Sequence, residues 1–342
     1  MTGNGVSSAG DASFHPRRLF DLSDRSRLRG SVVSGGIAGH KGARDIATPR
    51  SRGGASGRRA LATLLAIAAV AAVGCGGDDG DEAERAATTP ATAETTTDTG
   101  TDTTAEPDVD DRFAVGEQQT EVAIRCWGDG SPAVVFEAGH PASGLDDYDA
   151  QPGFQRLIAD LSQENQVCVY ARAGTPQSEP LPKRRRTVDD LVANLHELLP
   201  TAGVEAPYLL VGSSFGGLVV MHYAGRYRDD VAGIVLLDVP SAAPDLTPDI
   251  APEAAWDHPA NTEHVDAIAT ERLLATNPLP IAPIPVRVVT AADGASDAED
   301  QAYWLEFSPN ASQVTIEGGH DLHFDNPEAV AKEIRRTLGE AE

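Results

Sequence analysis

From about residue 112 onward, short apolar runs alternate with segments whose apolar residues recur at helical spacing. The expected strands are 134–138, 167–170, 208–211, 232–237, 286–290 and 313–316. The expected helices are 187–199, 216–227 and 327–338. Short strands that are apolar on both faces need helices on both sides. The alternation therefore predicts an α/β fold with a mostly parallel central sheet flanked by helices.

The alternation is interrupted between Pro240 and Pro285, where prolines are frequent and one run, 263–274, has helical spacing. A segment of this kind, placed between two strands of a sheet, has the position and size of an inserted lid. We therefore expect one folded domain over 112–342, with a small lid at about 240–285.

The apolar run 208–211 leads into the only G-x-S-x-G pattern of the chain, at 212–216, and a helical segment follows. A serine at a sharp strand-to-helix turn is exposed at the helix N-terminus, and glycines on either side make that turn sterically possible. The helix dipole there favours the negative charge that develops when serine attacks a carbonyl. We interpret Ser214 as a nucleophile; the alternatives are a phosphate-binding loop and an ordinary turn.

A serine hydroxyl needs a base to remove its proton. His320 follows the last expected strand and precedes the last helix, so it is the candidate base, with His323 as the second choice. The spacing of these two histidines also occurs in metal sites, but no third ligand clusters with them. We therefore expect neither a metal nor another cofactor.

The base needs a carboxylate to orient it. Asp238 ends the expected strand 232–237 and gives the chain order serine, aspartate, histidine. Asp293 and Asp297, which follow the next strand, are the alternative acids. If one of them serves instead, Asp238 is a strand-end residue that caps the following turn.

The oxyanion that forms on attack needs two N–H donors. One candidate is the N–H of Phe215, directly after the nucleophile. The other is the N–H of His140, in the loop that follows the expected strand 134–138. Pro141 has no N–H and cannot serve.

The N-terminal part of the chain has the composition of a targeting signal. Residues 1–59 form a basic leader, and 60–74 are apolar except for one threonine, which is too short a run for a bilayer span. Residues 72–75 resemble a bacterial lipobox, so the signal region is 60–75 and Cys75 is the expected lipidation site. The Thr-rich, acidic segment 76–111 is expected to be a flexible linker. The alternatives for the apolar run are a buried helix and an uncleaved membrane anchor. Because a signal is expected near the N-terminus, the long leader before it suggests that translation starts further downstream.

Charge divides the chain at the same place. The first 59 residues carry 11 Lys and Arg against 4 Asp and Glu, whereas the remainder carries 16 against 48. A surface this acidic repels phosphates, so nucleic acid is not an expected partner. The basic run 183–186 is an exception in this acidic part of the chain. It is either a contact for an anionic group or a solvated loop.

If Cys75 carries lipid, Cys126 and Cys168 remain, and the oxidising compartment implied by the signal allows a disulfide between them. The alternative is two buried free thiols. The expected location is extracytoplasmic, with the protein anchored to the cell membrane as a lipoprotein.

Together these residues resemble the bacterial α/β-hydrolases of the lipase, esterase and peptidase superfamily. The motifs that carry the resemblance are Cys126-x-Gly128, Phe136 to Gly139, Cys168 to Gly174, Tyr208 to Gly217, Leu236 to Asp238 and Gly319-His320. Members with these motifs often carry both cysteines, which supports the disulfide. The chain departs from the family pattern at Ala171, Pro176 and Ser213.

The resemblance implies a serine hydrolase that cleaves an ester or related acyl bond of a small molecule through an acyl-enzyme, without a cofactor. Two other functions stay open. One is an aminopeptidase that removes small N-terminal residues such as proline, because an acidic lid could attract a free amine. The other is a non-catalytic binding lipoprotein on a hydrolase fold.

Overall fold

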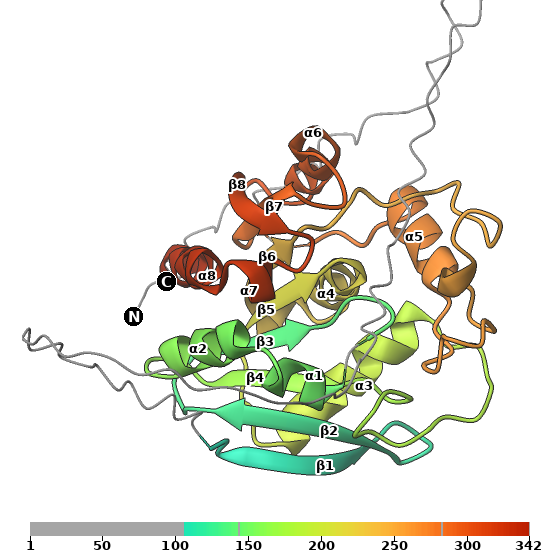
Figure 1. Cartoon of the computed structure of the whole chain (residues 1–342), viewed down its shortest axis with the longest axis horizontal. Helices are drawn as coiled ribbons and strands as arrows, with labels where there is room; N and C mark the ends of the chain where they lie inside the picture. The colour runs from blue at the N-terminus through green and yellow to red at the C-terminus, as the bar shows by residue number, and fades with distance from the viewer. Residues whose placement is uncertain (1–105, 143, 282, 342) are drawn as a thin grey trace, which may run out of the picture. The chain divides into compact units, whose positions relative to one another are not determined.

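The computed structural model describes residues 106–341 except 143 and 282 (Figure 1). The expected leader at 1–59, the signal region 60–75 with Cys75, and the linker 76–111 up to residue 105 lie outside the described residues. Their assignments therefore stay expectations.

A single eight-stranded sheet forms the centre of the described part (Figure 1). Its strands are β1 (Val109–Val115), β2 (Thr120–Trp127), β3 (Ala133–Glu137), β4 (Val167–Ala171), β5 (Tyr208–Ser213), β6 (Val231–Leu237), β7 (Val286–Asp293) and β8 (Ala311–Gly319). The spatial order is β1-β2-β4-β3-β5-β6-β7-β8. β2 runs antiparallel to both of its neighbours, and all the other pairs are parallel.

Helices cover both faces of this sheet, as expected from strands that are apolar throughout. All residues of β3, β4 and β5 are buried. One face packs against α3 (Val188–Thr201), α4 (Phe215–Arg226) and α5 (Ala267–Thr276). The other packs against α1 (Leu145–Asp149), α2 (Pro152–Leu161), α7 (Leu322–Asp325) and α8 (Pro327–Ala341). The predicted α/β architecture is confirmed.

The first two strands and α1 and α2 were not predicted from the sequence. β1 begins at Val109, inside the range expected for the linker, and reads VDDRFAV with its acidic side chains exposed. An edge strand that packs on few neighbours has little apolar pattern, so its sequence resembles the acidic segment before it.

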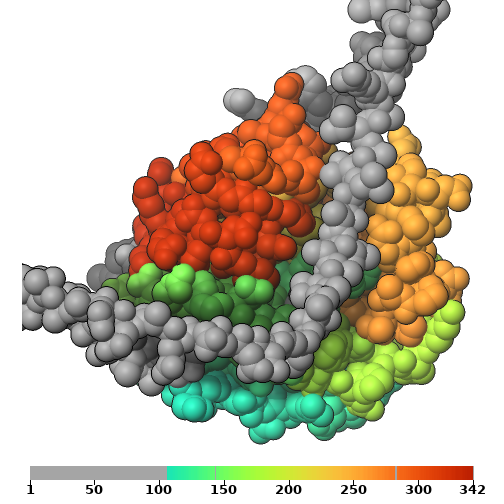
Figure 2. All heavy atoms as spheres, viewed as in Figure 1, coloured from blue at the N-terminus to red at the C-terminus, as the bar shows by residue number. Residues whose placement is uncertain are grey.

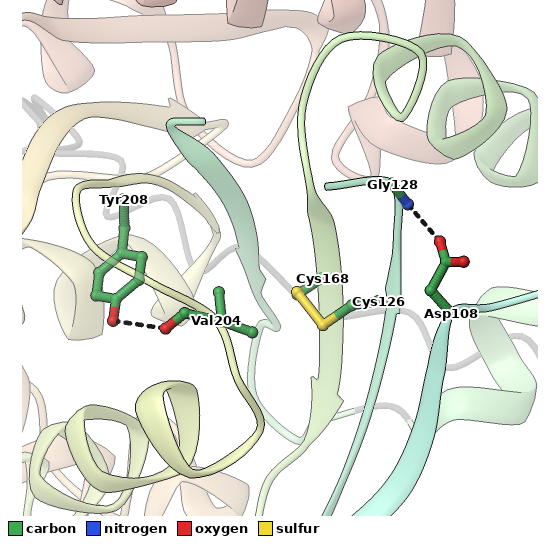
Figure 3. The surroundings of a disulfide bond; sticks show 6 residues. All are labelled: Asp108, Cys126, Gly128, Cys168, Val204 and Tyr208. Atoms are coloured by element: carbon green, nitrogen blue, oxygen red, sulfur yellow. Dashed lines mark hydrogen bonds between the residues drawn. A yellow bond between two sulfur atoms is a disulfide. The ribbon is translucent and has the colours of Figure 1, made fainter. Parts of the chain in front are cut away.

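Cys126 and Cys168 form a disulfide, which confirms that prediction (Figure 3). They lie directly opposite each other on the antiparallel strands β2 and β4, with a Cα–Cα distance of 4.1 Å. Both are fully buried. The bond therefore fixes the register of the antiparallel part of the sheet.

The segment between β6 and β7 lies where the lid was expected and contains the short turn η3 (Pro252–Ala254) and α5. This lid, orange in Figure 2, lies beside the yellow-green segment that carries the basic run 183–186. A parallel bridge joins Arg186 to Val265. Among the helices of the described part, none has both the length and the apolar character needed to cross a membrane.

Candidate active site

Ser214 stands between the end of β5 and the start of α4. Its backbone has φ 52° and ψ −126°, a strained combination for a residue with a side chain. Ser214 N–H donates to Leu237 O at 3.1 Å, which ties the turn to the end of β6. The side chain is partly exposed, and its Oγ bonds to no other described residue. This is the geometry expected of a nucleophile elbow.

The two glycines of the pattern are required by close backbone contacts. A Cβ on Gly212 would lie 2.6 Å from Gly216 O, and a Cβ on Gly216 would lie 2.6 Å from Ala138 O. Real side chains do not make such contacts with backbone. The sequence argument that the turn needs small residues is therefore supported by the structure.

His320 and Asp238 meet at the same edge of the sheet. Asp238 follows β6 and His320 follows β8, and in parallel strands all the carboxyl ends lie on one side. His320 Nδ1 lies 2.6 Å from Asp238 Oδ2. The Asp238 side chain is fully buried, whereas that of His320 is 32% exposed. This leaves the other ring nitrogen, Nε2, as the one that can accept a proton.

Further donors hold the Asp238 carboxylate in place. Its Oδ2 accepts from Ala295 N–H at 2.7 Å, and its Oδ1 accepts from Gln301 Nε2 at 2.6 Å. Burial alone would raise the pKa of Asp238, but the bonds from His320, Ala295 and Gln301 together hold it below its usual value. In turn, the bond to Asp238 raises the pKa of His320, although burial opposes this shift.

The other candidates for acid and base lie elsewhere. Asp293 is exposed at the end of β7, and Asp297 accepts from Asp300 N–H at the start of the short helix α6 (Ala298–Gln301). Neither bonds to His320. The second-choice base, His323, is buried among aromatic rings, and burial lowers its pKa to about 3.

The two expected oxyanion donors belong to segments that approach Ser214. Phe215 is the first residue of α4, and its N–H has no bonding partner among the described residues. His140 lies in the loop after β3. This loop passes close to the serine, as shown by Gly139, on which a Cβ would lie 3.4 Å from Ser214 Cβ. The His140 N–H is likewise without a bonding partner in the described part of the chain. Both amides therefore remain free of other described acceptors, as an oxyanion donor requires.

Several residues of the site were not predicted from the sequence. Gln301, which holds Asp238, lies in α6, the short helix that follows β7. Arg172 and Glu263 form a buried cluster beneath the loop of His140. A signal for Arg172 was present, because a charged residue directly after a fully apolar strand implies a buried partner. No group of three or more His, Cys, Asp or Glu residues in the described part is arranged to hold a metal ion.

Comparison with known proteins agrees with this geometry. Residues 132–276 match the family model described as alpha/beta hydrolase fold. A thermophilic esterase from Thermogutta terrifontis has a TM-score of 0.52 at 20% identity, over 69% of this chain and 99% of that one. An enol-lactonase from Burkholderia xenovorans has a TM-score of 0.54 at 20% identity, over 67% and 100%.

The chain has the α/β-hydrolase fold. The uncharacterized protein YqjL of Bacillus subtilis is also similar, with 25% identity over 218 residues that cover 59% of this chain and 82% of that protein. The family match begins at Pro132, just before β3, and includes the elbow, Asp238 and most of the lid. In this α/β-hydrolase fold, Ser214, Asp238 and His320 all follow strands at the carboxyl edge of the sheet.

Proposed function

We propose that this protein is a serine hydrolase that cleaves an ester or related acyl bond of a small molecule, with Ser214, His320 and Asp238 as its catalytic residues. The observation that carries the proposal is the 2.6 Å bond between His320 and a buried Asp238, at the sheet edge where Ser214 has a strained backbone. The family match supports hydrolase chemistry in general.

In the proposed reaction, Ser214 Oγ attacks the acyl carbon, and its proton passes to His320 Nε2. The oxyanion is held by the N–H groups of His140 and Phe215. Collapse of this intermediate breaks the ester bond, and His320 returns the proton to the leaving alcohol. Water then attacks the acyl-enzyme with His320 again as base, which releases the carboxylic acid and restores Ser214.

An ester is favoured over a peptide with a free amino group. An aminopeptidase needs an available carboxylate near the scissile bond to bind the substrate amine. Glu263, the lid carboxylate that contacts the His140 loop, is occupied by Arg172 and by Ala142 N–H. The two structural neighbours described above are named an esterase and an enol-lactonase. Both names denote enzymes that act on ester bonds, since a lactone is a cyclic ester.

The test is labelling of the protein with a fluorophosphonate, followed by mass spectrometry of the labelled peptide. We expect one label, on Ser214, and faster hydrolysis of p-nitrophenyl esters than of proline p-nitroanilide. Faster cleavage of the anilide would favour the aminopeptidase. A folded protein that neither takes the label nor cleaves an ester would favour the non-catalytic binding lipoprotein.

We also propose that the enzyme is tethered outside the cytoplasm by a lipid on Cys75. The support is the sequence alone: a basic stretch, a short apolar run and a lipobox-like tetrapeptide, followed by an acidic linker. In a bacterial host fed a labelled fatty acid, the protein should become labelled and sediment with membranes. Cys75→Ser should remove the label; a labelled Cys75→Ser protein would contradict the tether.

A further inference from the structure

A buried charge cluster lies beneath the loop that carries His140. Arg172 follows β4, Glu137 ends β3, and Glu263 belongs to the lid; the three side chains are at most 3% exposed. Arg172 Nη1 donates to Glu137 at 2.5 Å, and its Nε donates to Glu263 at 2.5 Å. Tyr170 Oη donates to the other oxygen of Glu137.

Arg172 also bonds to the backbone on the N-terminal side of His140. Its Nη1 donates to Ala138 O at 2.7 Å and its Nη2 donates to Gly139 O at 2.6 Å. The guanidinium lies 5.9 Å from the ring centre of Phe215, the residue with the second oxyanion amide. One side chain therefore contacts the segments that supply both proposed donors.

Glu263 holds the other side of the same loop. Its Oε1 accepts from Ala142 N–H at 3.0 Å and lies 3.3 Å from His140 Nδ1. The lid makes a second contact, because Glu253 O lies 3.3 Å from His140 Nε2. The loop is thus fixed between the Arg172 guanidinium and two points of the lid.

We infer that Arg172 and Glu263 are positioning residues, which hold the His140 N–H in the oxyanion position and make that position depend on a seated lid. The inference rests on the proposed function. Neither side chain contacts the reacting atoms; both act through the backbone of 138–142. Burial alone would raise the pKa of Glu263, but the charge of Arg172 and the hydrogen bonds from His140 and Arg172 together lower it.

The geometry requires arginine specifically. Nε, Nη1 and Nη2 of Arg172 together serve four acceptor groups that lie in different directions: two carboxylates and two carbonyls. Lysine has the same charge at a single point and cannot span these acceptors. Arg172→Lys should therefore keep most of the charge balance while it releases the loop.

A matched control exists at the other end of the parallel strands, where their amino ends lie. Arg287, near the start of β7, donates through Nε to Glu333 of α8 at 2.7 Å, and both side chains are about as buried as the first cluster. This pair touches neither the His140 loop nor the lid. Its variants report what the loss of a buried ion pair does to stability alone.

The experiment compares Arg172→Lys and Glu263→Gln with Arg287→Lys and Glu333→Gln in the full-length protein. We expect similar falls in melting temperature for the two pairs. At a temperature where all variants are folded, kcat for p-nitrophenyl butyrate should fall about 10²-fold at Arg172 and Glu263, with KM nearly unchanged. Affinity for a trifluoromethyl ketone, which forms an oxyanion when bound, should fall by a similar factor. The control variants should keep both values.

Amide hydrogen exchange of the peptide 137–142 gives a readout that does not need turnover. Exchange should accelerate in the Arg172 and Glu263 variants and stay unchanged in the controls. Wild-type kcat in all four folded variants, or equal losses in both pairs, would overturn the inference. If the wild type has no hydrolase activity, the proposed function fails, and unchanged exchange at 137–142 in the Arg172 and Glu263 variants would separately overturn the positioning role.

Discussion

The two halves of the sheet use different means to stay in place. In the parallel half, β5 and β6 are followed by residues with positive φ, Ser214 at 52° and Asp238 at 46°. Hydrogen bonds, including one from Gln301, hold the Asp238 carboxylate in place. In the antiparallel half, β2 and β4 are joined by the disulfide between Cys126 and Cys168. Two residues with positive φ thus lie where chemistry is proposed, and the covalent bond lies in the other half.

This difference implies that substitutions in the two halves should have different consequences. Changes at the carboxyl edge of the parallel strands should alter rate more than stability, because these side chains are partly exposed or hydrogen-bonded rather than packed in the core. Changes at the disulfide of the antiparallel half should alter stability and leave the chemistry of each folded molecule intact. The predictions below test this division, in order of expected effect on activity.

Removal of the proposed base should have the largest effect. His320→Ala should lower kcat for a p-nitrophenyl ester by at least about 10⁴-fold, because Ser214 then has no proton acceptor. Circular dichroism should show a folded protein, since the His320 side chain is partly exposed. A His320→Ala protein with a rate within about tenfold of wild type would contradict the assignment.

Asp238→Asn should come next, with a fall in kcat of about 10⁴-fold, because an amide no longer orients and stabilises the charged imidazole. Asp293→Asn and Asp297→Asn are matched controls, since both are carboxylates near the same edge that do not bond to His320. Their kcat should be close to wild type. A larger loss at either control than at Asp238 would reassign the acid.

The pH dependence of kcat/KM should show the coupling between these two residues. His320 must be neutral to accept a proton, and Asp238 raises its pKa above the usual value of about 6.5. Activity should therefore decline as the pH falls through a value above 6.5. Asp238→Asn should move this acid limb of the pH profile to lower pH. An acid limb that stays in place in Asp238→Asn would show that the coupling does not control activity.

The disulfide should give the smallest effect on activity. Closing a loop between cysteines 42 residues apart in sequence is expected to contribute about 4 kcal/mol to the free energy of unfolding. The double variant Cys126→Ala, Cys168→Ala should unfold at lower denaturant concentration and keep wild-type kcat when folded. A fall in kcat without a fall in stability would break the proposed division between the halves.

The sequence was sufficient to predict the strands and helices with strong apolar patterns, and to identify the candidate site residues that follow those strands. The runs at 208–211 and 232–237 located β5 and β6, and the residues after these strands follow from the topology. The choice between Asp238 and the later aspartates could not be made, because it depends on which side chain reaches His320 across the sheet.

Contacts between segments far apart in the chain could not be predicted from the sequence. Glu263 meets Arg172 across 91 positions of the chain, and nothing in the composition of the lid distinguishes it from the exposed acidic residues nearby. β1 was missed because an exposed, acidic edge strand lacks the alternation that marks a half-buried one.

The central claim is that Ser214 forms an acyl-enzyme, and trapping that species tests it most directly. The protein would be mixed rapidly with p-nitrophenyl acetate, quenched in acid and digested, and the peptides analysed by mass spectrometry. We predict a burst of p-nitrophenol together with one acetyl group on Ser214, both absent from Ser214→Ala. Steady hydrolysis by a folded protein with no acetyl on Ser214, or equal hydrolysis by Ser214→Ala, would contradict the account.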